Sequence, residues 1–206
     1  RHEVNVYIYW DRSKLPDAPD VSFAYDSAAD KMVLSGADST MEYRLKSETT
    51  KDWKPCTDEP LYFDVTGTAS ETYFVRYAAS GDVKASQITE LVLPGKKAAP
   101  SASYNSTTET FSGVSTSMEV QFGDGSYEPI TGKTLNVSDR IDSIADGETL
   151  SVNIRQKGTA TLPSGLIKSF TLYPRLAAPT SVTFNSVPLT LTGCSSAMQY
   201  RTDTQT

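Results

Sequence analysis

This sequence contains little histidine, little cysteine and no long hydrophobic run. A single histidine and two cysteines among 206 residues leave too few ligands for a zinc site and too few thiols for a framework of disulfides. A transmembrane helix needs at least about 18 consecutive apolar residues. Because no such run occurs, we expect no membrane insertion.

The charge balance also restricts the partners that we expect. The 25 acidic residues outnumber the 19 basic residues, which gives a formal net charge of −6. Proteins that bind nucleic acids neutralise phosphates with a basic surface, so we predict that nucleic acid is not a partner. The sequence starts within an alternating apolar pattern, without a charged and apolar leader, and we interpret the chain as a segment of a longer protein.

A repeat of about 80 residues is the clearest feature that the sequence does contain. An Ala-Pro pair, a hydroxyl residue followed by glycine, and a methionine five residues after that glycine recur three times in the same order. The prolines are Pro19, Pro100 and Pro179, the glycines are Gly36, Gly113 and Gly193, and the methionines are Met41, Met118 and Met198. These landmarks define the units of the chain.

We therefore divide the chain at its repeats. Residues 1–17 are expected to form the closing strand of a preceding module plus a linker, and residues 175–206 the start of a third, incomplete repeat. The complete repeats are residues 18–96 and residues 97–174. The segments between them are too short to act as flexible tethers, so neighbouring repeats should be held in a semi-rigid row.

Each complete repeat has the pattern of an antiparallel sandwich. Short segments alternate between apolar and polar residues and are separated by turn residues. Seven segments fit in the first repeat: 21–25, 31–35, 41–45, 53–56, 61–65, 72–77 and 88–93. Seven short strands per repeat predict an all-β chain of tandem immunoglobulin-like or fibronectin type III-like antiparallel β-sandwiches. The recurring methionines are expected in their cores, and helices are disfavoured by the many β-branched and aromatic residues.

The sequence resembles a group of bacterial surface domains. The shared order is Ala-Pro, Ser-Gly, Met-Glu-Tyr-Arg, a tryptophan that ends a hairpin, Tyr-x-Val-Arg and Ala-Ser, which this chain carries at 18–19, 35–36, 41–44, 53, 73–76 and 85–86. It is similar to the tandem repeat domains of Gram-positive surface proteins and secreted multi-modular glycanases. The resemblance implies an extracellular protein, at the bacterial cell surface or secreted, whose neighbouring domains are its partners. It implies no chemistry.

The second repeat departs from this pattern at three positions, one of which is Pro163, which precedes Ser164. Matching the Glu-Thr pairs of the two repeats places Asn153 where the first repeat has Arg76, and Tyr127 stands where the first repeat has Trp53. On this alignment, a ligand bound by Trp53 and Arg76 would not be bound by the second repeat.

Catalysis needs titratable groups that converge on one cleft, and the sequence offers none that do. The single acidic cluster consists of Asp52, Asp58, Glu59 and Asp64, and interspersed lysines make it typical of a solvated loop. His2 lies in the terminal segment. We therefore expect no enzyme activity and no cofactor.

Calcium binding is a minor alternative, because Ca²⁺ stabilises many extracellular β-domains through carboxylate oxygens. The candidates near junctions and hairpin tips are Asp17, Asp20, Asp38, Asp82, Asp124 and Asp146. A single Asp-Gly is more often a plain hairpin turn, so we predict no metal site.

An exposed aromatic side chain would be the platform for a sugar. Trp53 is the strongest candidate, followed by Tyr62 and Tyr127, with Arg76 as a further candidate ligand-binding residue. Alternatively, Trp53 covers one end of the sandwich core, as the large aromatic residue of an immunoglobulin-like domain does. Packing is favoured, because an aromatic residue recurs at position 127.

Two functions from different classes follow from these patterns. The first is a non-catalytic structural spacer or scaffold, and the alternative is an adhesion module that binds polysaccharide or a host ligand through Trp53 and its neighbours. A large buried junction between repeats would indicate a rigid rod, whereas independent tumbling would argue against it. Cys56 and Cys194 fall at different landmarks of different repeats, so both are expected to be free thiols.

Overall fold

The computed structural model describes residues 15–48, 53–176, 179–196 and 198. The first seven strands form sandwich one: β1 (Ser22–Asp26), β2 (Lys31–Ser35), β3 (Met41–Leu45), β4 (Lys54–Pro55), β5 (Leu61–Phe63), β6 (Glu71–Tyr77) and β7 (Thr89–Leu93). The next seven form sandwich two: β8 (Ser103–Asn105), β9 (Thr110–Ser112), β10 (Met118–Phe122), β11 (Glu128–Pro129), β12 (Leu135–Asn136), β13 (Leu150–Gln156) and β14 (Lys168–Leu172). A last hairpin pairs β15 (Thr183–Asn185) with β16 (Thr190–Thr192).

Both sandwiches have the same topology. Sandwich one pairs a three-stranded sheet, β1-β2-β5, with a four-stranded sheet, β4-β3-β6-β7. Sandwich two repeats this order as β8-β9-β12 and β11-β10-β13-β14. All the strand pairs are antiparallel. Three strands facing four is the arrangement of an immunoglobulin-like or fibronectin type III-like sandwich, so the predicted all-β fold class is confirmed.

The seven strands predicted for the first repeat are all present. Segments 31–35 and 41–45 match β2 and β3 at both ends, while 53–56 and 61–65 shorten to β4 and β5. Alternation between apolar and polar residues locates strands because their successive side chains point to opposite faces. Loops flank the shortened strands. In these loops the alternation of apolar and polar residues continues, but the residues do not pair with a neighbouring strand.

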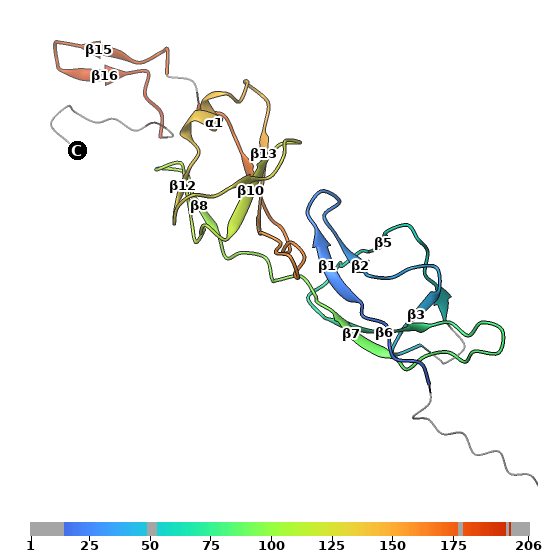
Figure 1. The fold of residues 1–206 in the computed structure, drawn as a ribbon. Coiled ribbons are helices and arrows are strands. Elements are labelled where there is room, and N and C mark those ends of the chain that lie inside the picture. The colour runs from blue at the N-terminus through green and yellow to red at the C-terminus, as the bar shows by residue number, and fades with distance from the viewer. Residues whose placement is uncertain (1–14, 49–52, 177–178, 197, 199–206) are drawn as a thin grey trace, which may run out of the picture.

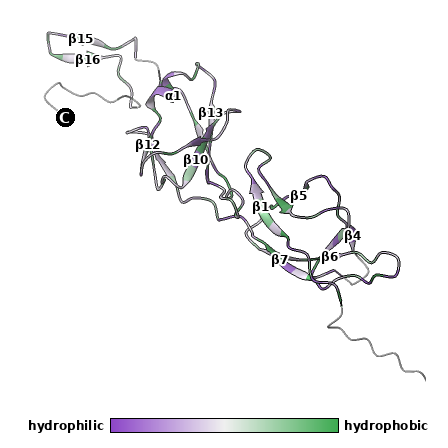
Figure 2. Cartoon of the chain, in the orientation of Figure 1, coloured by the Kyte–Doolittle hydropathy of each residue, from purple (hydrophilic) through white to green (hydrophobic). Residues whose placement is uncertain are grey.

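Each sandwich encloses its own core, to which Met41 and Met118 contribute as expected, whereas Met198 belongs to neither core. In sandwich one Met41 is 3% exposed and packs with Met32, Val75 and Leu93. In sandwich two the partly buried Met118 packs against a core of buried aliphatic residues around Phe111. Figure 2 shows hydrophobic residues concentrated in strands such as β5 and β10.

One short helix was not predicted. It is α1 (Ser138–Asp142), which lies between β12 and β13 and buries Ile141. The Asn136 side chain accepts hydrogen bonds from the backbone N–H and the hydroxyl of Ser138 and so fixes the first turn. A helix of five residues is too short to give a 3.6-residue period in the sequence.

The alignment that placed Asn153 opposite Arg76 is wrong. Arg76 on β6 pairs with Glu42 on β3, and Arg155 on β13 pairs with Glu119 on β10 in the same register. The residue equivalent to Arg76 is therefore Arg155. A shift of two residues keeps every side chain on its own face of the strand, so the alternation could not reveal the error.

The two sandwiches follow one another in a row, with the β15–β16 hairpin beyond them (Figure 1). The hairpin of β1 and β2 points from sandwich one toward sandwich two. The linker is attached at both ends: Lys96 N–H donates to the Gly67 carbonyl at 2.8 Å, and Leu166 N–H donates to the Lys97 carbonyl at 2.9 Å. No helix among the described residues is long and apolar enough to cross a membrane.

Candidate functional site

Trp53 lies on the outer face of the four-stranded sheet of sandwich one. It stands just before β4 and is partly exposed, and its ring is not part of the hydrophobic core. The Arg76 guanidinium carbon lies 3.9 Å from the centre of the Trp53 ring, and Arg76 Nε donates to Glu42 Oε1 at 2.7 Å. We call this Trp-Arg-Glu set stack one. Trp53 therefore does not cover the end of the core, and the packing role expected for it is wrong.

Stack one continues along the sheet through a second arginine. Arg44 lies 5.2 Å from the Trp53 ring and 4.8 Å from the Phe74 ring, and Lys46 lies 5.4 Å from Phe74. The Arg44 side chain is buried, and its Nη1 donates to three backbone carbonyls, of Leu45, Lys46 and Glu48. Cations and aromatic rings thus alternate across this face, an arrangement in which each contact is worth about 0.5–1 kcal/mol.

Sandwich two contains an equivalent set of ring, arginine and glutamate, which we call stack two. The Arg155 guanidinium carbon lies 3.7 Å from the centre of the Tyr127 ring, and Arg155 Nε donates to Glu119 Oε1 at 2.7 Å. Tyr127, Arg155 and Glu119 therefore occupy the positions of Trp53, Arg76 and Glu42. Two of the predicted site residues, Trp53 and Arg76, contact each other, and Tyr127 belongs to the equivalent stack.

Stack two differs because it receives a residue from sandwich one. Asp30 Oδ2 accepts a hydrogen bond from Arg155 Nη1 at 2.5 Å, and Asp30 Oδ1 accepts one from Ser164 Oγ at 2.7 Å. Tyr25 OH also donates to Asp30 Oδ1, at 2.6 Å. A carboxylate at the tip of one sandwich is thus held by an arginine and a serine of the next. We call this contact, with the residues around it, the junction.

The hairpin geometry explains why Asp30 reaches across. Asp30 has a positive φ of 53° just before β2, and Asp26 Oδ1 accepts from the backbone N–H groups of Ala28 and Ala29. Asp and Asn tolerate such left-handed positions better than most residues. Glu109 has a φ of 49° at the equivalent position of sandwich two, where Arg175 binds it. An acidic residue therefore recurs at this position of both complete hairpins.

Electrostatics at the junction favour the charged pair. Burial alone would raise the pKa of Asp30, but the hydrogen bonds from Ser164, Tyr25 and Arg155 outweigh burial and hold it below its ordinary value. Burial alone would lower the pKa of Arg155, but its hydrogen bonds to Asp30 and Glu119 raise it. Burial, with the hydrogen bond to Asp30, raises the pKa of Tyr25 to about 12. At neutral pH, Asp30 is therefore negatively charged, Arg155 is positively charged and Tyr25 is neutral.

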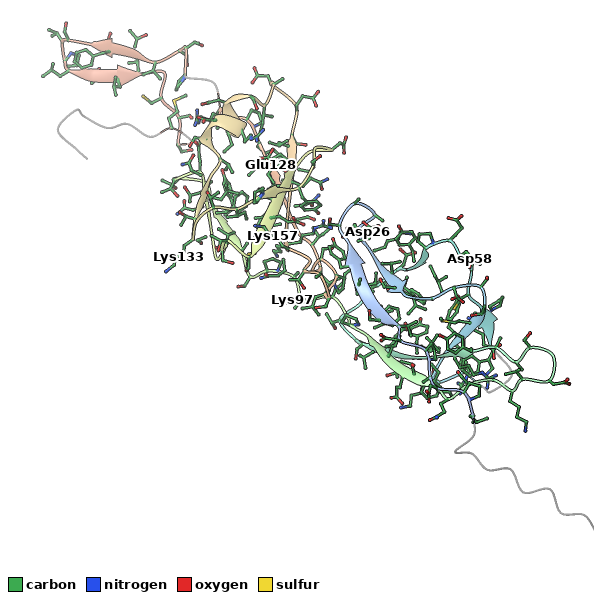
Figure 3. The ribbon with its side chains drawn as sticks, viewed as in Figure 1. Asp26, Asp58, Lys97, Glu128, Lys133 and Lys157 are labelled. Atoms are coloured by element: carbon green, nitrogen blue, oxygen red, sulfur yellow. The ribbon has the colours of Figure 1, made fainter. Side chains whose placement is uncertain are left out.

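Backbone contacts complete the junction. Tyr25 N–H donates to the Ala160 carbonyl at 2.9 Å, so the edge of β1 is hydrogen bonded to the loop between β13 and β14. The Tyr25 ring packs on Gly158, where an added Cβ would lie 2.2 Å from a ring carbon. Figure 3 shows Asp26 at the tip of β1, with Lys97 and Lys157 on the neighbouring side of sandwich two.

The structure does not bring Tyr62 to Trp53. Tyr62 is 42% exposed on β5, in the three-stranded sheet. Its neighbours Leu61 and Phe63 pack against the core, so Tyr62 points outward on the opposite side of the sandwich. There its hydroxyl donates to Asp26 Oδ2 at 2.9 Å.

The predicted acidic cluster does not form a site among the described residues. Asp58 Oδ1 accepts from the Ser39 backbone N–H, and Asp64 pairs with Lys31. Within the described part of the chain, no three histidine, cysteine or acidic side chains are grouped as metal ligands would be. Both cysteines are free, Cys56 buried and Cys194 exposed. His2 and Asp52 lie outside the described residues.

The comparisons with known proteins add little to this description. No protein-family model matches the chain, and no curated protein matches it. Among solved structures, the chicken interferon gamma receptor alpha chain covers 79% of this chain over 100% of its own length, at 11% sequence identity and a TM-score of 0.29. The fold assignment rests on the strand order of the chain itself.

Proposed function

We propose that this chain is a non-catalytic structural scaffold, in which consecutive sandwiches are fixed end to end and hold other domains of the same protein apart. The observation that carries the proposal is the Asp30–Arg155 pair. It joins residues 125 positions apart on two different sandwiches, and the Arg155 side chain is only 10% exposed. An arginine that is this deeply covered restrains the position of its partner much more than a surface ion pair does.

Three further contacts support a fixed orientation. The linker between the sandwiches is hydrogen bonded to both of them, at Lys96 and at Lys97. The Tyr25 N–H bond and the close packing of Tyr25 on Gly158 restrain rotation of the hairpin about the ion pair. Domain pairs with small polar interfaces move freely by default, and these contacts provide the restraint that such pairs lack.

The proposed location is extracellular, at a bacterial cell surface or secreted, with neighbouring domains of the same protein as the partners. The support is the sequence resemblance to repeat domains of Gram-positive surface proteins and secreted glycanases. A scaffold in that location needs a stable row of domains and a soluble surface, and the net charge of −6 favours solubility. Surface labelling of intact cells with an antibody against this chain tests the location.

The alternative, a carbohydrate- or host-ligand-binding module centred on Trp53, is less well supported by the geometry. A sugar needs a free aromatic face, and the guanidinium groups of Arg44 and Arg76 already lie against the Trp53 ring. Tyr62, the second aromatic candidate, lies on the other side of the sandwich from Trp53. A glycan array in which binding is lost with Trp53→Ala would favour this alternative.

The scaffold function is tested by rotational diffusion measured through backbone ¹⁵N relaxation. We expect sandwich one and sandwich two to share one diffusion tensor in the unchanged chain, and to tumble separately in Asp30→Ala. Asp82→Ala is a matched control, because it removes the same charge from an exposed loop of sandwich one. Separate tumbling in the unchanged chain would contradict the proposal.

A further inference from the structure

The chain leaves sandwich one along a closely packed backbone path. Lys96 N–H donates to the Gly67 carbonyl at 2.8 Å, in the segment between β5 and β6. Just before it, Gly95 lies so close to the same segment that an added Cβ would be 2.2 Å from the Thr68 carbonyl oxygen. Glycine permits such a close approach of two backbones. This exit is therefore held by backbone groups, which carry no net charge.

The chain leaves sandwich two by a different arrangement. β7 and β14 pair with β6 and β13 in matching registers, so Pro174 stands at the position of Gly95. One residue later, Arg175 stands at the position of Lys96. Pro174 carries a Cβ and a ring, and it cannot approach another backbone as closely as Gly95 does. With the described residues, the backbone of residues 174–176 makes no hydrogen bond equivalent to that of Lys96.

A charged side chain holds the exit of sandwich two. Arg175 Nε donates to Glu109 Oε1 at 2.6 Å, and Arg175 Nη2 donates to Glu109 Oε2 at 2.5 Å, which is a bidentate pair. Arg175 Nη1 also donates to Asp142 Oδ1. Glu109 stands at the tip of the β8–β9 hairpin, and Asp142 is the last residue of α1. One arginine thus ties the chain beyond β14 to two elements of sandwich two.

The position of α1 explains how it takes part in this contact. The segment between β12 and β13, where α1 lies, matches the segment between β5 and β6, which receives the backbone of Lys96 in sandwich one. Sandwich one has no helix among its described residues. The buried Ile141 anchors α1 in the core, and the next residue, Asp142, is exposed toward Arg175. The same segment therefore holds the exit in both sandwiches, by backbone contacts in one and by a carboxylate in the other.

The two kinds of contact differ in their sensitivity to salt. The side chain is 48% exposed for Arg175 and 58% exposed for Asp142, whereas Glu109 is mostly covered. At the junction between the sandwiches, the Arg155 side chain is only 10% exposed. Dissolved ions screen exposed charges more than covered ones, and the Debye length falls from about 30 Å at 0.01 M to about 3 Å at 1 M. We therefore expect salt to weaken the contacts of Arg175 first.

We propose that Arg175, Glu109 and Asp142 form an ionic latch, which holds the chain against sandwich two where it leaves that sandwich and opens as the salt concentration rises. The proposal rests on the scaffold function, because it states which joint of the row can be released. The junction between the two sandwiches stays closed in salt, since backbone groups hold its linker and its arginine is covered. When the latch opens, the residues that follow β14 move independently of sandwich two.

Nuclear magnetic resonance of the full chain tests the latch. Order parameters from ¹⁵N relaxation are measured for the backbone N–H and the side-chain Nε–H of Arg175. The backbone N–H of Lys96 is the internal reference for an exit without ionic contacts. Spectra are recorded at about 0.01 M and about 1 M sodium chloride, the range over which screening of exposed charges changes most.

Two double variants separate the latch from a general effect of charge. Glu109→Gln with Asp142→Asn removes both carboxylates of the latch and keeps the size of their side chains. Asp146→Asn with Glu148→Gln is the matched control, because it removes the same charge from an exposed turn of the same sandwich. The chemical shifts of the strands of sandwich two report whether each variant keeps its fold.

We expect the order parameter of the Arg175 backbone N–H to fall from about 0.85 at low salt to below about 0.6 at high salt, and to be low at both in the latch variant. The Nε–H should change in parallel, and Lys96 and the control variant should follow the unchanged chain. A value that does not respond to salt, or to loss of the two carboxylates, would overturn the latch. Shared tumbling of the two sandwiches, from the same data, tests the scaffold function: if they tumble together and Arg175 does not respond, only the latch fails.

Discussion

Arg76 and Arg155 occupy the same position in two sandwiches, with the same glutamate and the same type of ring contact, and differ in what covers them. A carboxylate from the preceding sandwich reaches Arg155, and its side chain is 10% exposed; that of Arg76 is 27% exposed. The stack is therefore a feature of each sandwich, and the junction is an addition to it. The comparison shows how one repeated surface serves either as an outer face or as an interface.

The residues around the two arginines account for the difference. Gly158 and Ser164 accommodate the Tyr25 ring and bind the Asp30 carboxylate, whereas alanines, Ala79 and Ala85, stand at the equivalent positions of sandwich one. Sandwich one therefore lacks the hydroxyl that binds Asp30 and carries a methyl group where the Tyr25 ring packs on Gly158. Repeats that share a fold can thus differ in neighbour specificity through side chains at their ends.

The largest expected effect is the loss of Arg155. Arg155→Ala removes the partner of Glu119 and Asp30 and should lower the free energy of unfolding of sandwich two by about 2–4 kcal/mol, because the mostly covered Glu119 and the partly exposed Asp30 both lose their charge partner. Arg76→Ala should cost about 1 kcal/mol, since its site is more exposed and holds one carboxylate. Urea unfolding followed by hydrogen exchange of each sandwich measures both. Equal losses would contradict the difference between the two stacks.

Gly158→Ala should release the junction without removing any charge. The new Cβ would overlap the Tyr25 ring, and the hairpin must move away, at a cost of about 1–3 kcal/mol. Gly67→Ala is the control, because a Cβ there meets no atom within 4 Å. Amide chemical shifts of residues on either side of the junction, near Tyr25 and Ala160, report the release. If they remain unchanged in Gly158→Ala, the packing described at this contact is wrong.

Acid should release the junction before it unfolds the sandwiches. The folded-state pKa of Asp30 lies below its ordinary value, so its contribution is fully present above the unfolded value of about 3.9 and is lost as the pH falls through the folded pKa. Asp30 is partly exposed, so we expect a loss of about 1 kcal/mol. Relaxation measurements between pH 6 and pH 2 follow the release. Asp30→Asn should remove this pH dependence, and its persistence would assign the effect to another group.

The smallest effect is expected at Tyr127. Its hydroxyl oxygen is buried and has no hydrogen-bond partner among the described residues. Tyr127→Phe removes that group and keeps the ring over Arg155, so stability should stay the same or rise by up to about 1 kcal/mol. A thermal melt of this variant is sufficient. A loss of stability would mean that the hydroxyl does make a stabilising contact.

The fold could be predicted in detail because a strand with one buried face has an apolar residue at every second position. The seven segments of the first repeat became seven strands for this reason. The same two-residue period did not reveal which residue of sandwich two is equivalent to Arg76, since Asn153 and Arg155 point to the same side of β13. Counting from the Glu-Thr pair gave the wrong one of these two positions, and only the pairing of Glu119 with Arg155 corrects it.

The junction could not be predicted from one sequence. Asp30 and Arg155 are far apart in the chain, and each has an ordinary place in its own sandwich: a turn residue and an outward strand residue. One available signal was the acidic residue just before the second strand of both hairpins, Asp30 and Glu109. Trp53 was recognised as notable, but its contacts with Arg44 and Arg76 depend on three strands meeting on one face.

The distance between two spin labels tests the central claim most directly, which is that the two sandwiches are held in one orientation. Labels attached through Glu59→Cys and Lys133→Cys, both at exposed positions, report this distance once Cys56→Val and Cys194→Ser have removed the native thiols. We predict one narrow distance distribution by double electron–electron resonance, and a broad one when Asp30→Ala and Gly158→Ala are added. A broad distribution before those changes would contradict the scaffold.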